Sequence, residues 1–211
     1  MALFVIFAAQ LIFCMKKNYP VLLTLLLLVL SASLYRVWEG RPAGFAPQLA
    51  MALFGGAVIR DKRLALVLPL LSMLISDAVY QFLYLKGYSS IPGFYEGQLL
   101  NYALFVGLTM FGFLLKSHKP LKIAVFTISG SLLFFLTSNF FVWLGGGGFN
   151  RPKTVDGLMQ CYGDALAFYR DHGAIPGFWG NFLLGDLFFT AVLFAAYALL
   201  YKPHAERQLS V

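Results

Sequence analysis

The chain has 211 residues, of which 60% are hydrophobic and only 12% are charged. A soluble domain averages about 45–50% apolar and about 25% charged residues. This composition, with a mean hydropathy of +0.76, therefore excludes a soluble globule, a disordered chain, a coiled coil and a nucleic-acid-binding module. The sequence predicts an all-α integral membrane protein.

The N-terminal segment differs from the rest of the chain. Residues 1–14 are apolar, but they are too few to cross a membrane and lack the basic start of a signal peptide. Met15-Lys16-Lys17-Asn18 follows, which is typical of a bacterial N-terminus. We therefore expect residues 1–18 to be an N-terminal extension, with the physiological start at Met15. The alternative is a helix that lies on the membrane surface.

Six apolar stretches approach the roughly 20 residues that a helix needs to cross a membrane. They predict a six-helix membrane domain over residues 19–201, followed by a cytoplasmic tail over residues 202–211. The second stretch is short, so we expect neighbouring helices to shield it, and Pro69 is expected to kink the third. The stretches are Tyr19–Tyr35, Gln48–Ile59, Leu64–Leu85, Gln98–Leu115, Leu121–Leu144 and Gly180–Tyr201.

Basic residues indicate the orientation, because cytoplasmic loops carry an excess of lysine and arginine. With both termini in the cytoplasm, the inner side includes the basic turns Arg60–Arg63 and Lys116–Pro120, whereas the outer loops mix basic with acidic residues. The net charge of +7 is then a consequence of topology and requires no anionic partner. We expect a multi-pass protein of the bacterial inner membrane.

A long outer segment, Gly145–Trp179, separates the fifth and sixth predicted helices. Its four opening glycines, Gly145–Gly148, have no helix or strand preference and suggest a hinge. Thr154–Tyr169 then has the pattern of an amphipathic helix. This segment is either a lid over the outer face or a helix lying at the membrane surface.

Ionisable residues within membrane spans are costly and commonly functional. Asp77 and Asp186 lie inside spans, and helix rise places both in the outer third of the membrane. Amides from other spans reach the same depth, and three polar residues follow Asp77 on its helix face. We therefore predict a ligand site, the alternative being two structural acids bound to neighbouring helices. The candidate residues are Asp77, Tyr80, Gln81, Tyr84, Asn101, Asn139, Asn181 and Asp186.

Small and polar residues on the fifth span, Thr127, Ser131 and Ser138, have the spacing of a helix-packing stripe, and we interpret them in that way. Histidine chemistry is not favoured, because His118, His172 and His204 lie outside the spans. The chain has no glycine-rich phosphate loop and no motif for a metal or a cofactor, and its two cysteines are too few for a disulfide framework.

Four strings resemble an uncharacterised bacterial inner-membrane family, a domain of unknown function, over roughly residues 19–201. The strings cover residues 45–57, 69–77, 130–144 and 180–187. More distantly, the order of Pro47, Gly55–Gly56, Asp77 and Asp186 is similar to the S components of energy-coupling-factor (ECF) vitamin transporters. That resemblance implies a vitamin- or cofactor-precursor-like ligand at an outward-facing site between helices, and a membrane coupling partner with separate ATPases. The small-residue docking pattern of the first helix in S components is not evident in Tyr19–Tyr35.

Three functions follow as hypotheses. The first is binding or uptake of a small molecule, with the lipid bilayer and the ligand as partners. The second is a non-catalytic subunit of a larger membrane complex. The third is an intramembrane aspartyl protease in which Asp77 and Asp186 share a proton. The sequence leaves enzymatic activity open but does not favour it.

Overall fold

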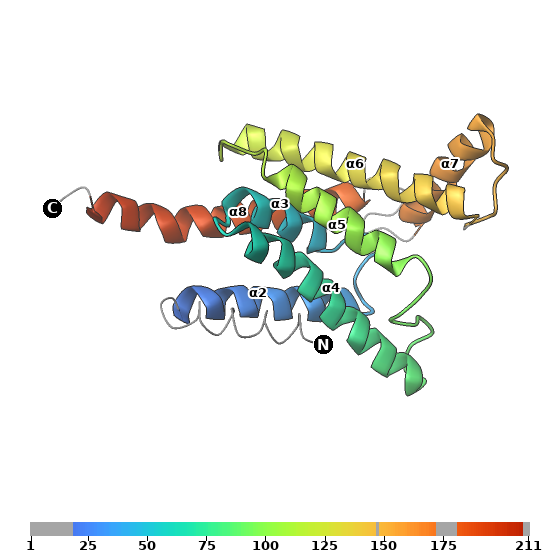
Figure 1. The fold of residues 1–211 in the computed structure, drawn as a ribbon, viewed down its shortest axis with the longest axis horizontal. Helices are drawn as coiled ribbons and strands as arrows, with labels where there is room; N and C mark the ends of the chain where they lie inside the picture. Colours follow the sequence, from blue (N-terminus) through green and yellow to red (C-terminus); the bar gives the residue numbers. More distant parts are fainter. Residues whose placement is uncertain (1–18, 147, 172–180, 209–211) are drawn as a thin grey trace.

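The computed structural model describes residues 19–146, 148–171 and 181–208, so the expected extension over residues 1–18 lies outside the described residues. Every regular element in the described part of the chain is a helix (Figure 1). The helices are α2 (Tyr19–Val37), α3 (Gln48–Val58), α4 (Lys62–Leu85), α5 (Gln98–Gly112), α6 (Pro120–Gly145), α7 (Val155–Asp171) and α8 (Asn181–Gln208).

The helices coincide closely with the predicted stretches, except that α8 continues to Gln208 rather than ending at Tyr201. Three of them are long and apolar enough to cross a membrane, at Lys62–Leu85, Pro120–Gly145 and Phe182–Leu199. The other apolar helices, Leu26–Val37, Gln48–Val58 and Gln98–Gly112, are shorter within the described side chains. The protein is therefore all-α, with helices suited to a membrane.

Successive apolar helices run back and forth along the long axis of the molecule (Figure 1). Helix α7 and the 86–97 loop lie at one end, which we call the α7 end. The α5–α6 connection and the C-terminal half of α8 lie toward the opposite end. Pro69 does not end α4, which continues as one helix from Lys62 to Leu85.

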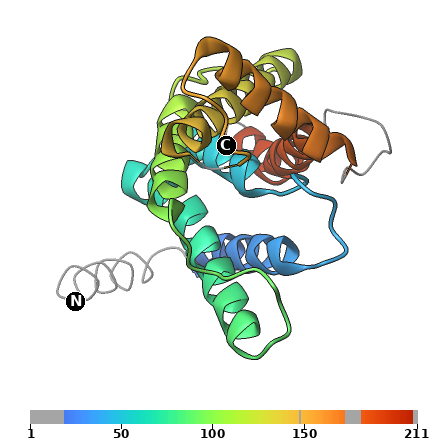
Figure 2. The same cartoon turned by 90° about the vertical axis from the view of Figure 1, so that its right-hand side faces the viewer.

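The short helix α3 is the centre of the bundle, and it packs against α4, α5, α6 and α8 (Figure 2). Most of its residues are buried, including Leu49, Ala52 and Leu53, which belong to the main apolar cluster with Phe105 and Leu108 of α5. At 1.5 Å per residue, its 11 residues span only about 16 Å. The prediction that neighbouring helices shield the short second stretch is confirmed.

Two glycines make the contact between α3 and α5 possible. A Cβ added at Gly56 would lie 2.2 Å from the carbonyl oxygen of Thr109 and 2.9 Å from the Cα of Gly112. A Cβ added at Gly112 would lie 2.7 Å from the carbonyl oxygen of Leu53. Because these contacts are backbone against backbone, a side chain at either position would force the helices apart.

Replacing Gly56 with alanine should lower the free energy of unfolding by about 1–3 kcal/mol, as overpacking of a close contact does. Gly107→Ala is the matched control, because Gly107 lies within α5 and nothing would touch its Cβ within 4 Å. That substitution should be neutral or stabilise the protein by about 0.5–1 kcal/mol. Thermal unfolding of the two variants in detergent measures the difference, and equal melting temperatures would contradict the close α3–α5 contact.

Helix α7 folds where the amphipathic pattern predicts it, over Val155–Asp171 rather than Thr154–Tyr169. The Thr154 hydroxyl accepts a hydrogen bond from the Gly157 N–H and so caps its N-terminus. After α6, Gly146 and Gly148 have φ of 80° and 64°, the left-handed region that favours glycine. The hydroxyl of Tyr162 donates to the Leu136 carbonyl oxygen at 3.1 Å, so α7 packs against α6.

A bidentate ion pair holds α7 to the segment before it. Arg151 Nε and Nη2 lie 2.8 and 2.9 Å from the two carboxylate oxygens of Asp164. The hydrogen bond from Arg151 holds the pKa of Asp164 below its usual value. A lowered pKa means that the ion pair stabilises the fold above the unfolded-state pKa of Asp164 and is lost as the pH falls through the folded-state pKa.

Asp164→Asn should therefore speed hydrogen exchange of α7 amides at neutral pH. The difference from the unsubstituted protein should shrink as the pH falls into the acidic range where Asp164 itself becomes protonated. Arg151→Gln should reproduce the effect, since it removes the other partner. A difference that persists undiminished at acidic pH would contradict this role of the ion pair.

Candidate functional site

Asp77 is the most buried acid in the described structure, with 1% of its surface exposed. Its Oδ1 forms an ion pair with the Arg36 guanidinium of α2. Its Oδ2 accepts hydrogen bonds from Gln98 Nε2 at 2.6 Å and from the Tyr102 hydroxyl at 2.7 Å. Both carboxylate oxygens are thus occupied, and the contacts join α2, α4 and α5.

Arg36 is itself held in place by the residues around it. Its guanidinium also donates to the Ser76 hydroxyl, one residue before Asp77. Its backbone carbonyl oxygen, at the end of α2, accepts hydrogen bonds from the Tyr80 hydroxyl and from Arg41 Nε, both at 2.8 Å. A charge taken out of water must be paired, and Arg36 and Asp77 meet that need for each other.

Gln81 fixes the 86–97 loop against α4. Its Oε1 accepts hydrogen bonds from the backbone N–H groups of Gly93 and Phe94, at 3.1 and 3.2 Å. A Cβ added at Gly93 would lie 1.8 Å from the carbonyl oxygen of Asp77, so only glycine allows the loop to come so close. Gln98 also donates to the Gly93 carbonyl oxygen at 3.0 Å, which ties the loop to the Asp77 contacts.

Asp186 has a different environment on α8. It is 5% exposed, and Oδ2 accepts a hydrogen bond from the Ser131 hydroxyl of α6 at 2.6 Å. It forms no ion pair with any residue in the described ranges. Gly185 beside it faces Phe45, whose Cα would lie 2.9 Å from an added Cβ. Among the described residues, this acid is therefore buried without a cation paired to it.

A cavity of about 410 Å³ lies between the helices, and Asp186 is part of its wall. The cavity takes residues from α2, α3, α4, α5, α6 and α8, together with residues of the loops at the α7 end. Its lining is Arg36, Arg41, Gly44, Ala46, Gln48, Leu49, Met73, Tyr95, Asn101, Phe105, Ser131, Phe134, Phe135, Ser138, Asn139, Val142, Phe182 and Asp186. Half of these residues are polar or charged, and apolar side chains such as Leu49 and Phe135 form the rest of the wall.

Gln48 also lines this cavity and carries a buried acceptor. The residue is 3% exposed, and its Nε2 donates to the Ala32 carbonyl oxygen of α2 at 3.2 Å. Its Oε1 is buried and has no hydrogen-bond partner in the described structure. A buried polar atom without a partner is costly, so it calls for an explanation.

The structure places the predicted site residues in different surroundings. Asn101, Asn139 and Asp186 line the cavity. The others do not line it: Asp77 is enclosed by its ion pair, Tyr80 and Gln81 hold backbone groups, and Tyr84 is exposed at the end of α4. The side chain of Asn181 lies outside the described residues, while its backbone begins α8.

Several residues that complete these contacts were not predicted from the sequence. Arg36 could have been considered, because a buried acid is commonly paired with a cation and Arg36 lies in the last turn of the neighbouring helix. Ser131 was assigned to a packing stripe, and it does join α6 to α8, but it does so through Asp186. Gln48, Gln98 and Tyr102 carry no such signal, because their roles depend on how the helices cross.

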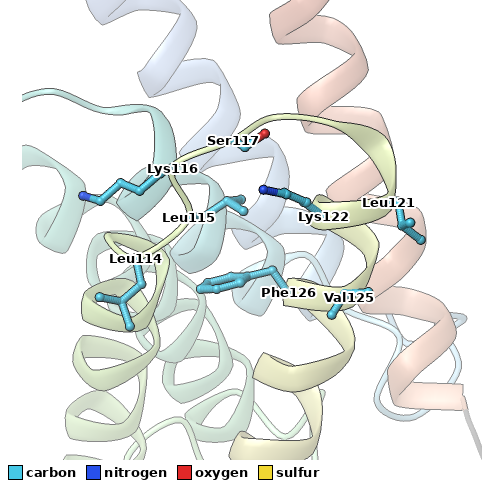
Figure 3. A pocket seen from close by; sticks show the side chains of 8 residues that line it. All are labelled: Leu114, Leu115, Lys116, Ser117, Leu121, Lys122, Val125 and Phe126. Carbon is cyan, nitrogen blue, oxygen red and sulfur yellow. The ribbon is translucent and has the colours of Figure 1, made fainter.

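A second cavity, also about 410 Å³, lies toward the opposite end between the end of α5 and the start of α6 (Figure 3). Its polar side chains are those of Lys116, Ser117 and Lys122, and the rest of its lining is apolar. It includes no buried acid and no unpaired buried atom of the described residues. We therefore place the candidate site in the first cavity, whose wall includes Asp186, and call it the central cavity.

Comparisons with known proteins identify the family but no function. No curated protein and no solved structure matches the chain, and the comparisons give no evidence for the similarity to S components of ECF transporters. One family model covers residues 16–209, almost the whole chain. The protein therefore belongs to the family of unknown function DUF6580.

Proposed function

We propose that the protein binds a small molecule in the central cavity and that this binding serves uptake across a bacterial inner membrane. The observation that carries the proposal is a cavity of about 410 Å³ whose wall contains a buried acid, Asp186, that forms no ion pair with any described residue. Ligand pockets commonly have volumes of about 300–1,000 Å³, and polar groups in their walls orient the ligand. This cavity has a volume in that range, and its wall combines apolar with polar and charged side chains.

The proposed topology has six membrane helices with both termini in the cytoplasm, so that the α7 end faces outward. Basic residues support this orientation, because Lys116, Lys119 and Lys122 lie around the α5–α6 connection at the opposite end. The cavity lining includes loop residues of the α7 end, such as Arg41 and Tyr95. A ligand would then enter from the outer side.

The two other hypotheses receive less support. For the aspartyl protease, Asp77 pairs with Arg36 and Asp186 accepts from Ser131, so each acid has its own partners. A dyad that shares one proton needs its two carboxyl groups together. For a subunit of a larger complex, exposed apolar side chains such as Leu99 and Leu121 give no specific support, because such side chains are equally expected where a helix contacts lipid. A coupling partner with separate ATPases remains a proposal that follows from the S-component resemblance alone.

A thermal-shift screen of the purified protein against vitamins and related cofactor precursors tests the proposal. Binding to the folded state raises the melting temperature, and the rise grows with ligand concentration. Ser138→Trp provides the test variant, because Ser138 lines the cavity and a large side chain there would fill it. Ser129→Trp is the matched control, since Ser129 lies on the same helix with its side chain exposed.

A ligand of the central cavity should stabilise the unsubstituted protein and the Ser129→Trp variant but not the Ser138→Trp variant. If no compound stabilises the protein, or if stabilisation survives Ser138→Trp, the proposed function is wrong.

A further inference from the structure

We propose that the ligand of the central cavity is a zwitterion, with an amino or amidine group at Asp186 and an acidic group at Arg41. This inference rests on the proposed function, since it assigns the chemistry of the ligand to the same cavity. The inference follows from a comparison of the charged groups in the cavity wall. Some of them have an oppositely charged partner within the protein, and others have none among the described residues.

The first step concerns Asp186. It lines the cavity and is buried, and its one hydrogen bond from the described residues comes from the neutral hydroxyl of Ser131. It forms no ion pair with any of those residues. A buried acid in that position favours a ligand group that donates hydrogen bonds and carries positive charge. Ammonium and amidinium groups have both properties.

The second step concerns the arginines in the wall. Arg36 also lines the cavity, but its charge is compensated by Asp77 behind it. Arg41 uses only Nε, which donates to the Arg36 carbonyl oxygen at 2.8 Å. Its terminal nitrogens have no hydrogen-bond or ion-pair partner among the described residues. A guanidinium with free terminal nitrogens is suited to a carboxylate or phosphate.

Together these steps give the cavity one uncompensated negative group and one uncompensated positive group. A ligand with only an amino group would leave Arg41 without an anion, and a ligand with only an acidic group would leave Asp186 without a cation. The same wall offers apolar contact through Leu49, Phe105, Phe134 and Phe135. The expected ligand therefore has an apolar middle and opposite charges at its ends.

Four probes of similar size test this assignment, with binding measured by saturation-transfer NMR on the protein in detergent. They are 4-(aminomethyl)benzoic acid, benzylamine, benzoic acid and benzyl alcohol. The zwitterion should bind best and benzylamine less tightly. Asp186→Asn should weaken binding of both amines, the zwitterion and benzylamine. Of these two compounds, Arg41→Gln should weaken only the zwitterion. Its affinity should fall about 10-fold, because one charge-assisted hydrogen bond is lost. The cavity-filling Ser138→Trp should abolish binding, and Ser129→Trp should not.

The inference is overturned if benzoic acid or benzyl alcohol binds as well as the zwitterion, if no probe binds, or if the Arg41 and Asp186 substitutions have no effect. Those results would not by themselves overturn the proposed function. The thermal-shift screen decides that question, because it also includes uncharged and anionic compounds. A compound from that screen that binds in the cavity but lacks an amino group would likewise overturn the zwitterion assignment alone.

Discussion

Replacing Asp77 with alanine is expected to lower the free energy of unfolding by about 3–5 kcal/mol, the usual cost of removing one partner of a buried ion pair. The Arg36 charge would lose its counterion, and Gln98 and Tyr102 would each lose an acceptor. Because these contacts join three helices, the whole bundle should be affected. Thermal unfolding in detergent should show a fall in melting temperature on the order of 10 °C.

Two controls make the Asp77 prediction specific. Asp156→Ala removes an exposed acid of α7 that has no basic partner among the described residues, so its effect should be small. The double substitution Arg36→Met with Asp77→Leu should recover much of the lost stability, because an apolar pair can replace a buried ion pair. An Asp77→Ala variant as stable as the unsubstituted protein would contradict a structural role for this acid.

Asp186→Asn should have the opposite profile, with little change in stability and a large loss of ligand affinity. Asparagine keeps an oxygen that can accept from Ser131, so the α6–α8 contact is retained. A charge-assisted hydrogen bond contributes about 1.5–3 kcal/mol, so binding of an amino-bearing ligand should weaken about 10- to 150-fold. Titration of 4-(aminomethyl)benzoic acid followed by NMR measures the change.

Asp77→Asn is the comparison for that measurement, because it also neutralises a buried acid on a helix long and apolar enough to cross a membrane. It should lower the melting temperature, whereas the affinity of the protein that remains folded should change much less. If instead Asp186→Asn destabilises the protein and leaves binding unchanged, Asp186 is a structural acid like Asp77.

The positions of the helices could be predicted from the sequence because hydrophobic length is a local property. Each stretch of apolar residues predicts one helix, and the predicted turns Arg60–Arg63 and Lys116–Pro120 lie near the starts of α4 and α6. The short α3 was also recognised, since an 11-residue apolar helix has to be surrounded by protein. Only the C-terminal extent of α8 differed appreciably.

The candidate site was predicted from the depth of its residues along the membrane helices. Depth alone does not determine which side chains contact one another. Asp77 and Asp186 are both buried acids, and both lie on helices that are long and apolar enough to cross a membrane. Their roles differ because α2 brings Arg36 to Asp77, whereas α6 brings only Ser131 to Asp186. Which helices are neighbours depends on close contacts such as Gly56 against Thr109, and these involve residues far apart in the sequence. The face of α4 shared by Asp77, Tyr80 and Gln81 is therefore a structural surface that holds Arg36 and the 86–97 loop.

The central claim is that the cavity beside Asp186 is a ligand site, and dialysis against a metabolite extract tests it most directly. The unsubstituted protein, Ser138→Trp and Ser129→Trp are each equilibrated with a small-molecule extract of the expression host, and mass spectrometry identifies the compounds that each protein retains. We predict that the unsubstituted protein and Ser129→Trp enrich the same small molecule and that Ser138→Trp does not. Enrichment of nothing, or equal enrichment by Ser138→Trp, would contradict the claim.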